Sequence, residues 1–163
     1  MAVIALENLA ATQRLGRFLA ASVQQYPGMH VLLLRGPLGS GKTSLVRSLV
    51  EALPNGDQAE VASPSFTLCH YYPTLPPVAH HDLYRTPENL PDELFDGLEN
   101  PGVLTIVEWA EYLLSLYTPQ HYLDIFLQPC IEYRHCTIQA HGVPAGKILQ
   151  RLHDVWPVKP QKP

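Results

Sequence analysis

Apolar and polar positions along the chain follow two periods, one typical of helices and one typical of strands. Between Thr12 and Gln25 the apolar side chains recur every three or four residues, which predicts an amphipathic helix that Thr12 can cap. The run Val31–Leu34 is short, continuous and apolar, and so predicts a strand. Helical spacing returns at Thr43–Leu53, and the turn-forming residues that follow Leu53 end this second predicted helix.

The second half of the chain is mostly strand-like. Two extended runs, Thr67–Tyr72 and Val78–Tyr84, are separated by a proline-rich stretch and predict a hairpin at a sheet edge. Val103–Val107 is uninterrupted and apolar, as expected of a strand buried on both faces. The remaining predicted elements are a short acidic helix at Glu88–Phe95, strands at Tyr122–Leu127 and Tyr133–Ala140, and a last helix at Ala145–Val155.

A glycine-rich segment joins the first predicted strand to the second predicted helix. It reads Gly-Pro-Leu-Gly-Ser-Gly-Lys-Thr and fits the P-loop pattern GxxxxGK[ST]. The backbone N–H groups of such a loop surround a polyphosphate, the lysine bridges its outer phosphates, and the hydroxyl reaches Mg²⁺. The nucleotide-binding residues predicted here are Gly36, Leu38, Gly39, Ser40, Gly41, Lys42, Thr43 and Ser44, with Lys42 also assigned a catalytic role.

The P-loop and the order of elements together predict the fold class. We expect an α/β P-loop NTPase, a three-layer sandwich with a mixed, mostly parallel sheet and an edge β-hairpin. A length of 163 residues suits one domain with one core. Residues 1–156 are therefore expected to form a single P-loop ATPase domain, and residues 157–163 a flexible C-terminal tail.

Composition narrows the possible partners and the cellular location. Lys and Arg number 11 against 15 Asp and Glu, so the formal net charge of -4 provides no general attraction to nucleic acid or anionic lipid. Any connection to RNA is expected to be indirect. Cys69, Cys130 and Cys136 have no metal-site spacing, and no apolar run is long enough to cross a membrane, which favours a cytoplasmic protein with reduced thiols.

Two carboxylates complete the predicted chemistry. P-loop folds place a Mg²⁺-holding acid where a buried strand ends, and Glu108 follows the apolar run Val103–Val107 directly. Asp82 lies in His80-His81-Asp82-Leu83-Tyr84-Arg85, where alternation puts His80 and Asp82 on one strand face and His81 on the other. Asp82 is a candidate either to orient the attacking water or to complete the outer shell of the metal. A metal site made from the two adjacent histidines is disfavoured because they face opposite ways.

The segment Ser63-Pro64-Ser65-Phe66 lies between the P-loop helix and the strand that carries Asp82. In nucleotide hydrolases this is the place of segments that sense the γ-phosphate. Its serine hydroxyls are suited to bind phosphate or metal-bound water, so we interpret it as a switch segment.

Four separated motifs resemble the bacterial TsaE family, a group of small P-loop ATPases of tRNA threonylcarbamoyladenosine synthesis. In order they are Leu-Gly-x-Gly-Lys-Thr, Ser-Pro-Ser-Phe-Thr, His-x-Asp-Leu-Tyr-Arg and Glu-Trp. The resemblance runs from about Thr12 to the last helix. It implies ATP and Mg²⁺ as cofactors and the TsaD and TsaB proteins as partners, with tRNA contacted only through that complex.

The resemblance also implies residue roles. Thr43 and Glu108 would hold the metal, and Asp82 would be catalytic or metal-linked. Thr12 and Arg134 would approach the nucleotide base, and Trp109 matches the Glu-Trp pair. Three positions, which are Pro37, Ser40 and Ser65, depart from the residues most usual in the family, yet each leaves the required backbone geometry or hydroxyl in place.

Three other functions compete with this interpretation. A small-molecule or nucleoside kinase would need an acceptor pocket with an arginine-rich lid, whereas Arg35, Arg47 and Arg85 are scattered along the chain. A GTPase switch would need an Asn-Lys-x-Asp stretch, which the sequence lacks. A nucleotide-binding regulator without turnover stays open at this point.

Overall fold

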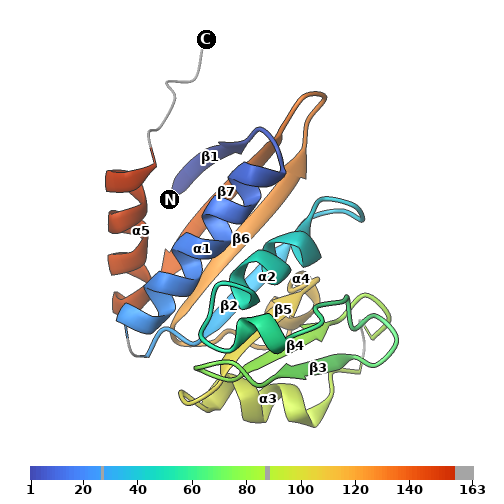
Figure 1. Cartoon of the computed structure of the whole chain (residues 1–163). Coiled ribbons are helices and arrows are strands. Elements are labelled where there is room, and N and C mark those ends of the chain that lie inside the picture. Colours follow the sequence, from blue (N-terminus) through green and yellow to red (C-terminus); the bar gives the residue numbers. More distant parts are fainter. Residues whose placement is uncertain (27, 87–88, 157–163) are drawn as a thin grey trace.

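A computed structural model describes residues 1–26, 28–86 and 89–156 of the chain. Its seven strands form one sheet in the order β1-β7-β6-β2-β5-β4-β3 (Figure 1). The strands are β1 Ala2–Leu6, β2 Val31–Arg35, β3 Cys69–Tyr72, β4 Val78–Asp82, β5 Leu104–Glu108, β6 Tyr122–Pro129 and β7 Arg134–His141. The central strands β6, β2, β5 and β4 are mutually parallel, and the pairs β1–β7, β6–β7 and β3–β4 are antiparallel. The predicted α/β fold, with its mixed sheet and an edge hairpin, is confirmed.

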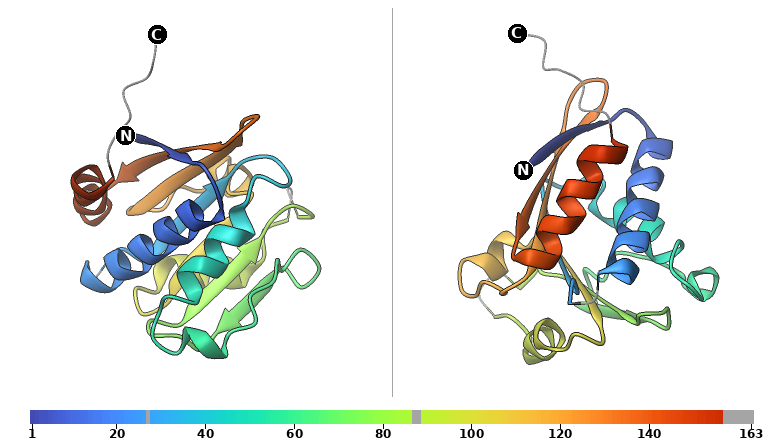
Figure 2. Two further views of the ribbon diagram at one scale, coloured as in Figure 1. Left: turned by 45° about the horizontal axis from the view of Figure 1, so that its top comes forward. Right: turned by 90° about the vertical axis from the view of Figure 1, so that its left-hand side faces the viewer.

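Helices cover both faces of the central strands and make the three layers (Figure 2). The helices are α1 Leu9–Gln25, α2 Lys42–Val50, α3 Asp92–Glu99, α4 Glu111–Leu114 and α5 Val143–Val155, with a 3₁₀ turn at Gly56–Gln58. One buried cluster joins α1, α2 and α5 to the sheet, and a second joins α3 and α4 to the opposite face. The alternate residues of β2 divide between them, since Leu32 and Leu34 face the first cluster and Val31 and Leu33 face the second.

The start of α1 differs from the prediction that Thr12 caps this helix. The cap is Asn8, whose side-chain oxygen accepts a hydrogen bond from the Ala11 N–H at 2.9 Å. A short asparagine side chain next to extended backbone is among the best N-caps, so the helix begins at Leu9. Thr12 instead lies buried within the helix, where its hydroxyl donates to the Asn8 carbonyl.

Other element boundaries differ from the prediction for local reasons. The predicted acidic helix begins later, at Asp92, because Pro91 has extended backbone and restricts the residue before it. Strand β4 ends at Asp82, two residues earlier than predicted, because the Asp82 side chain accepts a hydrogen bond from the Tyr84 N–H and turns the chain. Strand β1 and helix α4 were not predicted. Residue 88 and the expected tail at 157–163 lie outside the described residues.

The helices α1 and α2 pack closely where Gly16 meets Ser48. A Cβ on Gly16 would lie 2.5 Å from the Ser48 Cβ and 2.7 Å from its backbone carbon. Only a glycine allows this approach, which brings α2 directly against α1. Among the described residues, no helix has the length and apolar character needed to span a lipid bilayer.

Candidate functional site

The P-loop connects the end of β2 to the first residue of α2, and its path depends on glycine. Gly36 has φ +134°, and a Cβ there would lie 2.2 Å from the Leu127 carbonyl oxygen of β6. Gly41 precedes α2 with φ +98°, in the left-handed region that side chains disfavour. These two residues let the backbone turn tightly between strand and helix.

The amino end of α2 presents groups that a phosphate could satisfy. No side chain caps this nine-residue helix, and the carbonyl of Gly41 accepts its first hydrogen bond from Leu45. The N–H groups of Lys42, Thr43 and Ser44 therefore precede the first intrahelical bond. The Ser40 hydroxyl is buried and has no hydrogen-bond partner within the described part of the chain. Free N–H donors, a helix dipole and an unpartnered buried hydroxyl fit an anionic ligand.

Lys42 is buried at the first position of α2, and its ammonium group lies inside the loop. Its Nζ donates to the carbonyls of Gly36 at 2.7 Å and Pro37 at 3.1 Å, and lies 4.1 Å from the ring centroid of Trp109. Burial lowers the pKa of Lys42, an effect that Glu108 and other nearby carboxylates partly offset. The loop therefore holds a buried lysine whose charged form is disfavoured by loss of water, and a bound anion would favour that form.

Thr43 and Glu108, the predicted metal pair, are in direct contact. The Thr43 hydroxyl donates to Glu108 Oε1 at 2.8 Å, although the two residues are 65 positions apart in sequence. No group of three or more His, Cys, Asp and Glu side chains that could hold a metal ion occurs among the described residues. One hydroxyl and one carboxylate nevertheless suit Mg²⁺, which keeps several waters and takes phosphate oxygens as further ligands.

Asp82 lies beside Glu108 and is held by the predicted switch segment. Asp82 pairs with Glu108 across the β4–β5 ladder, and its Oδ2 accepts a hydrogen bond of 2.6 Å from the Ser63 hydroxyl. Its other oxygen, Oδ1, accepts from the Tyr84 N–H at 3.0 Å. The structure thus joins Ser63-Pro64-Ser65-Phe66 to the predicted catalytic acid. Within this segment Phe66 is 83% exposed and carries the Arg85 guanidinium 4.4 Å above its ring.

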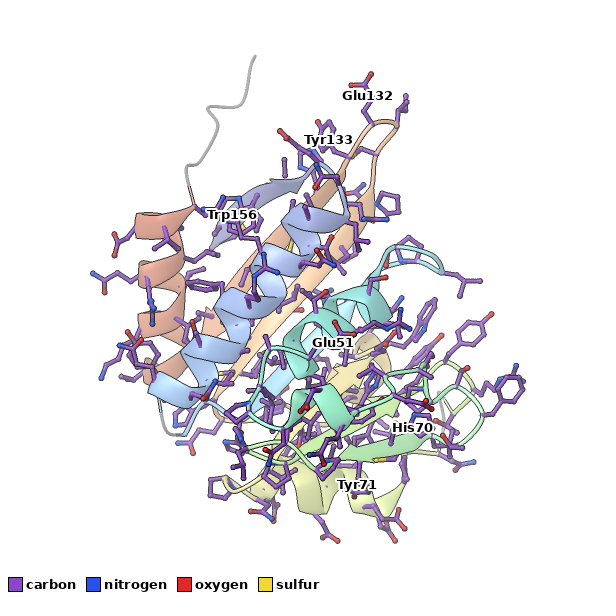
Figure 3. All side chains as sticks on the ribbon, in the orientation of Figure 1. Glu51, His70, Tyr71, Glu132, Tyr133 and Trp156 are labelled. Atoms are coloured by element: carbon purple, nitrogen blue, oxygen red, sulfur yellow. The ribbon has the colours of Figure 1, made fainter. Side chains whose placement is uncertain are left out.

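Two residues predicted to lie near the nucleotide base have different surroundings. Arg134 begins β7, next to the β6–β7 turn that Glu132 and Tyr133 mark in Figure 3. A Cβ on Gly41 would lie 3.4 Å from Arg134 Nε, so this cation borders the P-loop. Thr12 is 2% exposed, and both its hydroxyl and its N–H donate to the carbonyl of Asn8, the cap of the same helix. The base-contacting role of Thr12 therefore remains a prediction.

The remaining predicted nucleotide-binding residues are in the loop and in the first turn of α2. Leu38 is at the exposed tip of the loop, and Gly39 has open space around its Cα, since a Cβ there would meet nothing within 4 Å. Ser44 lies in the first turn of α2, where its carbonyl accepts from the Ser48 hydroxyl at 2.8 Å. Their proposed contacts to nucleotide come through backbone N–H groups.

The sequence did not single out the contact between His80 and Glu108. His80 Nε2 lies 2.9 Å from Glu108 Oε1, and neither side chain is more than 3% exposed. Alternation on β4 placed His80 on the face of Asp82, but the parallel neighbour of β4 could not be read from the sequence. His81 faces away and contacts Cys69, with 3.6 Å between its Nε2 and the sulfur, which agrees with the argument against a two-histidine metal site.

Comparison with known proteins identifies several similar proteins. The family model described as "Threonylcarbamoyl adenosine biosynthesis protein TsaE" matches residues 6–136. The tRNA threonylcarbamoyladenosine biosynthesis protein TsaE of Synechocystis sp. is 41% identical over 117 residues, which cover 68% of this chain and 71% of that protein. The protein of the same name from Aquifex aeolicus is 39% identical over 111 residues, covering 66% and 76%.

A solved structure also shares the fold. The crystal structure of Bacillus subtilis YdiB matches with a TM-score of 0.72 and 25% sequence identity, and the match covers 94% of each chain. Its coverage extends beyond the family match, so nearly the whole described arrangement of sheet and helices has a counterpart in that protein.

Proposed function

This chain belongs to the TsaE family, and on that premise we propose that it is a Mg²⁺-dependent ATPase that supports threonylcarbamoylation of adenosine in tRNA. In this proposal it is an accessory protein that cycles on and off a complex of TsaD and TsaB in the cytoplasm. The observation that carries the nucleotide chemistry is the contact of Thr43 with Glu108 at the amino end of an uncapped α2. In this proposal residues 1–156 form one ATPase domain.

The proposed binding of ATP uses charge and backbone donors of this chain. The N–H groups at the start of α2 and the Lys42 ammonium would bind the β- and γ-phosphates, and Arg134 would border the nucleotide from β7. Thr43 and Glu108 would hold Mg²⁺, which when bound neutralises phosphate charge. Lys42 now donates to loop carbonyls, so phosphate binding would exchange those partners for anionic ones.

Asp82 is the proposed catalytic carboxylate. Its Oδ2 accepts the Ser63 hydroxyl and its Oδ1 accepts a backbone N–H, so its orientation is fixed from two sides. A fixed acceptor beside the phosphate site can orient a water for attack and take its proton. Because Ser63 belongs to the switch segment, movement of that segment on nucleotide binding would alter the position of Asp82.

The proposed role as an accessory protein follows from charge and exposure. A net charge of -4 gives no general attraction to tRNA, so contact with tRNA is expected through the TsaD and TsaB partners. Phe66 is exposed in the switch segment, next to Arg85. Aromatic and arginine side chains are frequent anchors of protein interfaces. We infer that ATP orders this segment for docking and that hydrolysis resets the assembly.

The experiment compares ATP turnover by the isolated chain with turnover in the presence of TsaD, TsaB and tRNA. We expect slow turnover alone, faster turnover in the mixture, and co-elution with TsaD and TsaB that depends on Mg-ATP. Lys42→Ala should abolish the stimulated turnover, whereas Lys147→Ala, on the exposed side of α5, should not. Absence of association both with Mg-ATP and without nucleotide contradicts the accessory role. Rapid turnover by the isolated chain with phosphate transfer to a small acceptor would favour a kinase.

A further inference from the structure

We propose that His80 is a positioning residue, whose imidazole orients the Glu108 carboxylate for Mg²⁺. The inference rests on the proposed function, because it assigns His80 to the metal site named there. His80 is fully buried on β4, and its Nε2 lies 2.9 Å from Glu108 Oε1. A polar ring that is buried away from water needs a hydrogen-bond partner to offset the loss of its hydration.

The chemistry of the two groups fixes the direction of this hydrogen bond. An ionised carboxylate can only accept, so the proton lies on Nε2 of His80 and is donated to Glu108. The opposite ring nitrogen, Nδ1, is then an acceptor and lies 3.4 Å from the Tyr72 hydroxyl oxygen, whose single proton is shared between Nδ1 and the Ala62 carbonyl at 3.3 Å. The imidazole is therefore held between the edge hairpin and the carboxylate, and it cannot turn without losing both contacts.

The position of the two donors explains why His80 matters for the metal. The Thr43 hydroxyl and His80 Nε2 both reach the same oxygen, Oε1, of Glu108. The second oxygen, Oε2, receives none of the hydrogen bonds between described residues, and so it would be available to bind the ion. Thr43 is itself a proposed metal ligand and cannot serve as a constant anchor. His80 is bound only to protein groups, so it can hold the carboxylate before and after the ion arrives.

A hydrogen-bonded outer shell of this kind is known to affect metal affinity. Loss of such a partner leaves the last torsion of a glutamate, which has a broad rotational preference, free to point the carboxylate elsewhere. The usual cost is about tenfold to a hundredfold in metal affinity. His81 provides a matched control, because it is the adjacent buried histidine on the same strand and faces Cys69 on the opposite side of the sheet.

The experiment measures the ATP dissociation constant by calorimetry with Mg²⁺ and with EDTA, and takes the ratio of the two values. His80→Leu should reduce this Mg²⁺-dependent ratio about tenfold, and His80→Asn, whose amide is too short to reach Glu108, should do the same. His80→Gln places an amide nitrogen near the position of Nε2 and should retain the ratio to within about threefold. His81→Leu should leave it unchanged. The affinity in EDTA should be equal in all variants, which a general structural defect would not produce.

The outcomes separate this inference from the proposed function. A wild-type chain whose ATP affinity is the same with Mg²⁺ and EDTA contradicts the metal site itself and removes the basis for both. A wild-type chain with a clear Mg²⁺ effect that His80→Leu and His80→Asn preserve overturns only the role of His80. If His80→Leu does not fold, as judged by its thermal melt, the test is the comparison of His80→Asn with His80→Gln. Equal Mg²⁺-dependent ratios in these two variants would overturn the role of His80.

Discussion

Asp82 at the end of β4 pairs directly with Glu108 at the end of β5, across a parallel ladder. Two carboxylates thus terminate adjacent central strands at one edge of the sheet. Each is held by a different hydroxyl, Asp82 by Ser63 at 2.6 Å and Glu108 by Thr43 at 2.8 Å. Because one hydroxyl belongs to the switch segment and the other to the P-loop, the two acids can carry separate roles although they are neighbours.

The first prediction separates the two acids by conservative substitution. Glu108→Gln removes the charge opposite Thr43 and should weaken ATP binding in Mg²⁺ while leaving binding in EDTA unchanged. Asp82→Asn should retain Mg-ATP affinity and lose turnover, because an amide cannot accept the proton of an attacking water. Equilibrium binding and single-turnover hydrolysis measure the two effects. Wild-type turnover in Asp82→Asn would exclude Asp82 from catalysis.

The second prediction concerns Lys42. A charge-assisted contact contributes about 1.5–3 kcal/mol, so Lys42→Ala should weaken ATP binding by about tenfold or more. Burial lowers the pKa of Lys42, so in the absence of phosphate the charged ammonium group is less stable here than it is in water. The substitution should therefore not lower the unfolding temperature. Calorimetry and thermal melts measure both effects, with Lys147→Ala as the control, and unchanged affinity in a folded Lys42→Ala protein would refute the phosphate-binding role.

Local sequence patterns were sufficient to predict the P-loop, its flanking strand and helix, and the edge hairpin. They were sufficient because each of these features is determined by a few consecutive residues. The features are the P-loop motif, the continuous apolar run of β2 and the proline-rich connection. The acid at Glu108 was predicted in the same way, from the end of an apolar run. The Glu-Trp resemblance added Trp109, whose ring lies under the Lys42 ammonium.

What the sequence did not predict depends on pairing between distant segments. Strand β1 is five residues long and pairs with β7, near the other end of the chain, so its own pattern carries little signal. The contact of His80 with Glu108 requires β4 and β5 to be parallel neighbours in a particular register. The predicted start of α1 was wrong because asparagine and threonine are both good N-caps, and the structure uses Asn8 rather than Thr12.

The third prediction tests the close packing of α1 on α2. Gly16→Ala would place a methyl group 2.5 Å from the Ser48 Cβ and should destabilise the protein by about 1–3 kcal/mol. Gly146→Ala in α5 is the matched control, because a Cβ there meets nothing within 4 Å. It should stabilise the protein by about 0.5–1 kcal/mol, since alanine is the better helix former. Urea unfolding measures both, and equal shifts in the two variants would contradict the packing.

The last prediction is a loss of stability in acid that originates at His81. Burial lowers the pKa of His81 from 6.5 to about 4, and the neighbouring His80 acts in the same direction, while Glu93 opposes it weakly. Cys69, which contacts the ring, adds no charge there because burial raises the pKa of its thiol. Below pH 6.5 the unfolded chain gains a proton at this position that the folded chain does not accept. The stability from this neutral histidine is therefore complete above pH 6.5 and is lost as the pH falls toward about 4.

This contribution can be isolated by comparing wild type with His81→Leu. The wild-type free energy of unfolding should fall between pH 6.5 and about 4 more steeply than that of the variant, by up to about 1.4 kcal/mol per pH unit. Above that window the two curves should run parallel, because neither state of the wild type titrates at His81 there. Urea unfolding at a series of pH values gives both curves. Parallel curves across the whole range would show that His81 gains its proton equally well in the folded protein, contrary to its burial on β4.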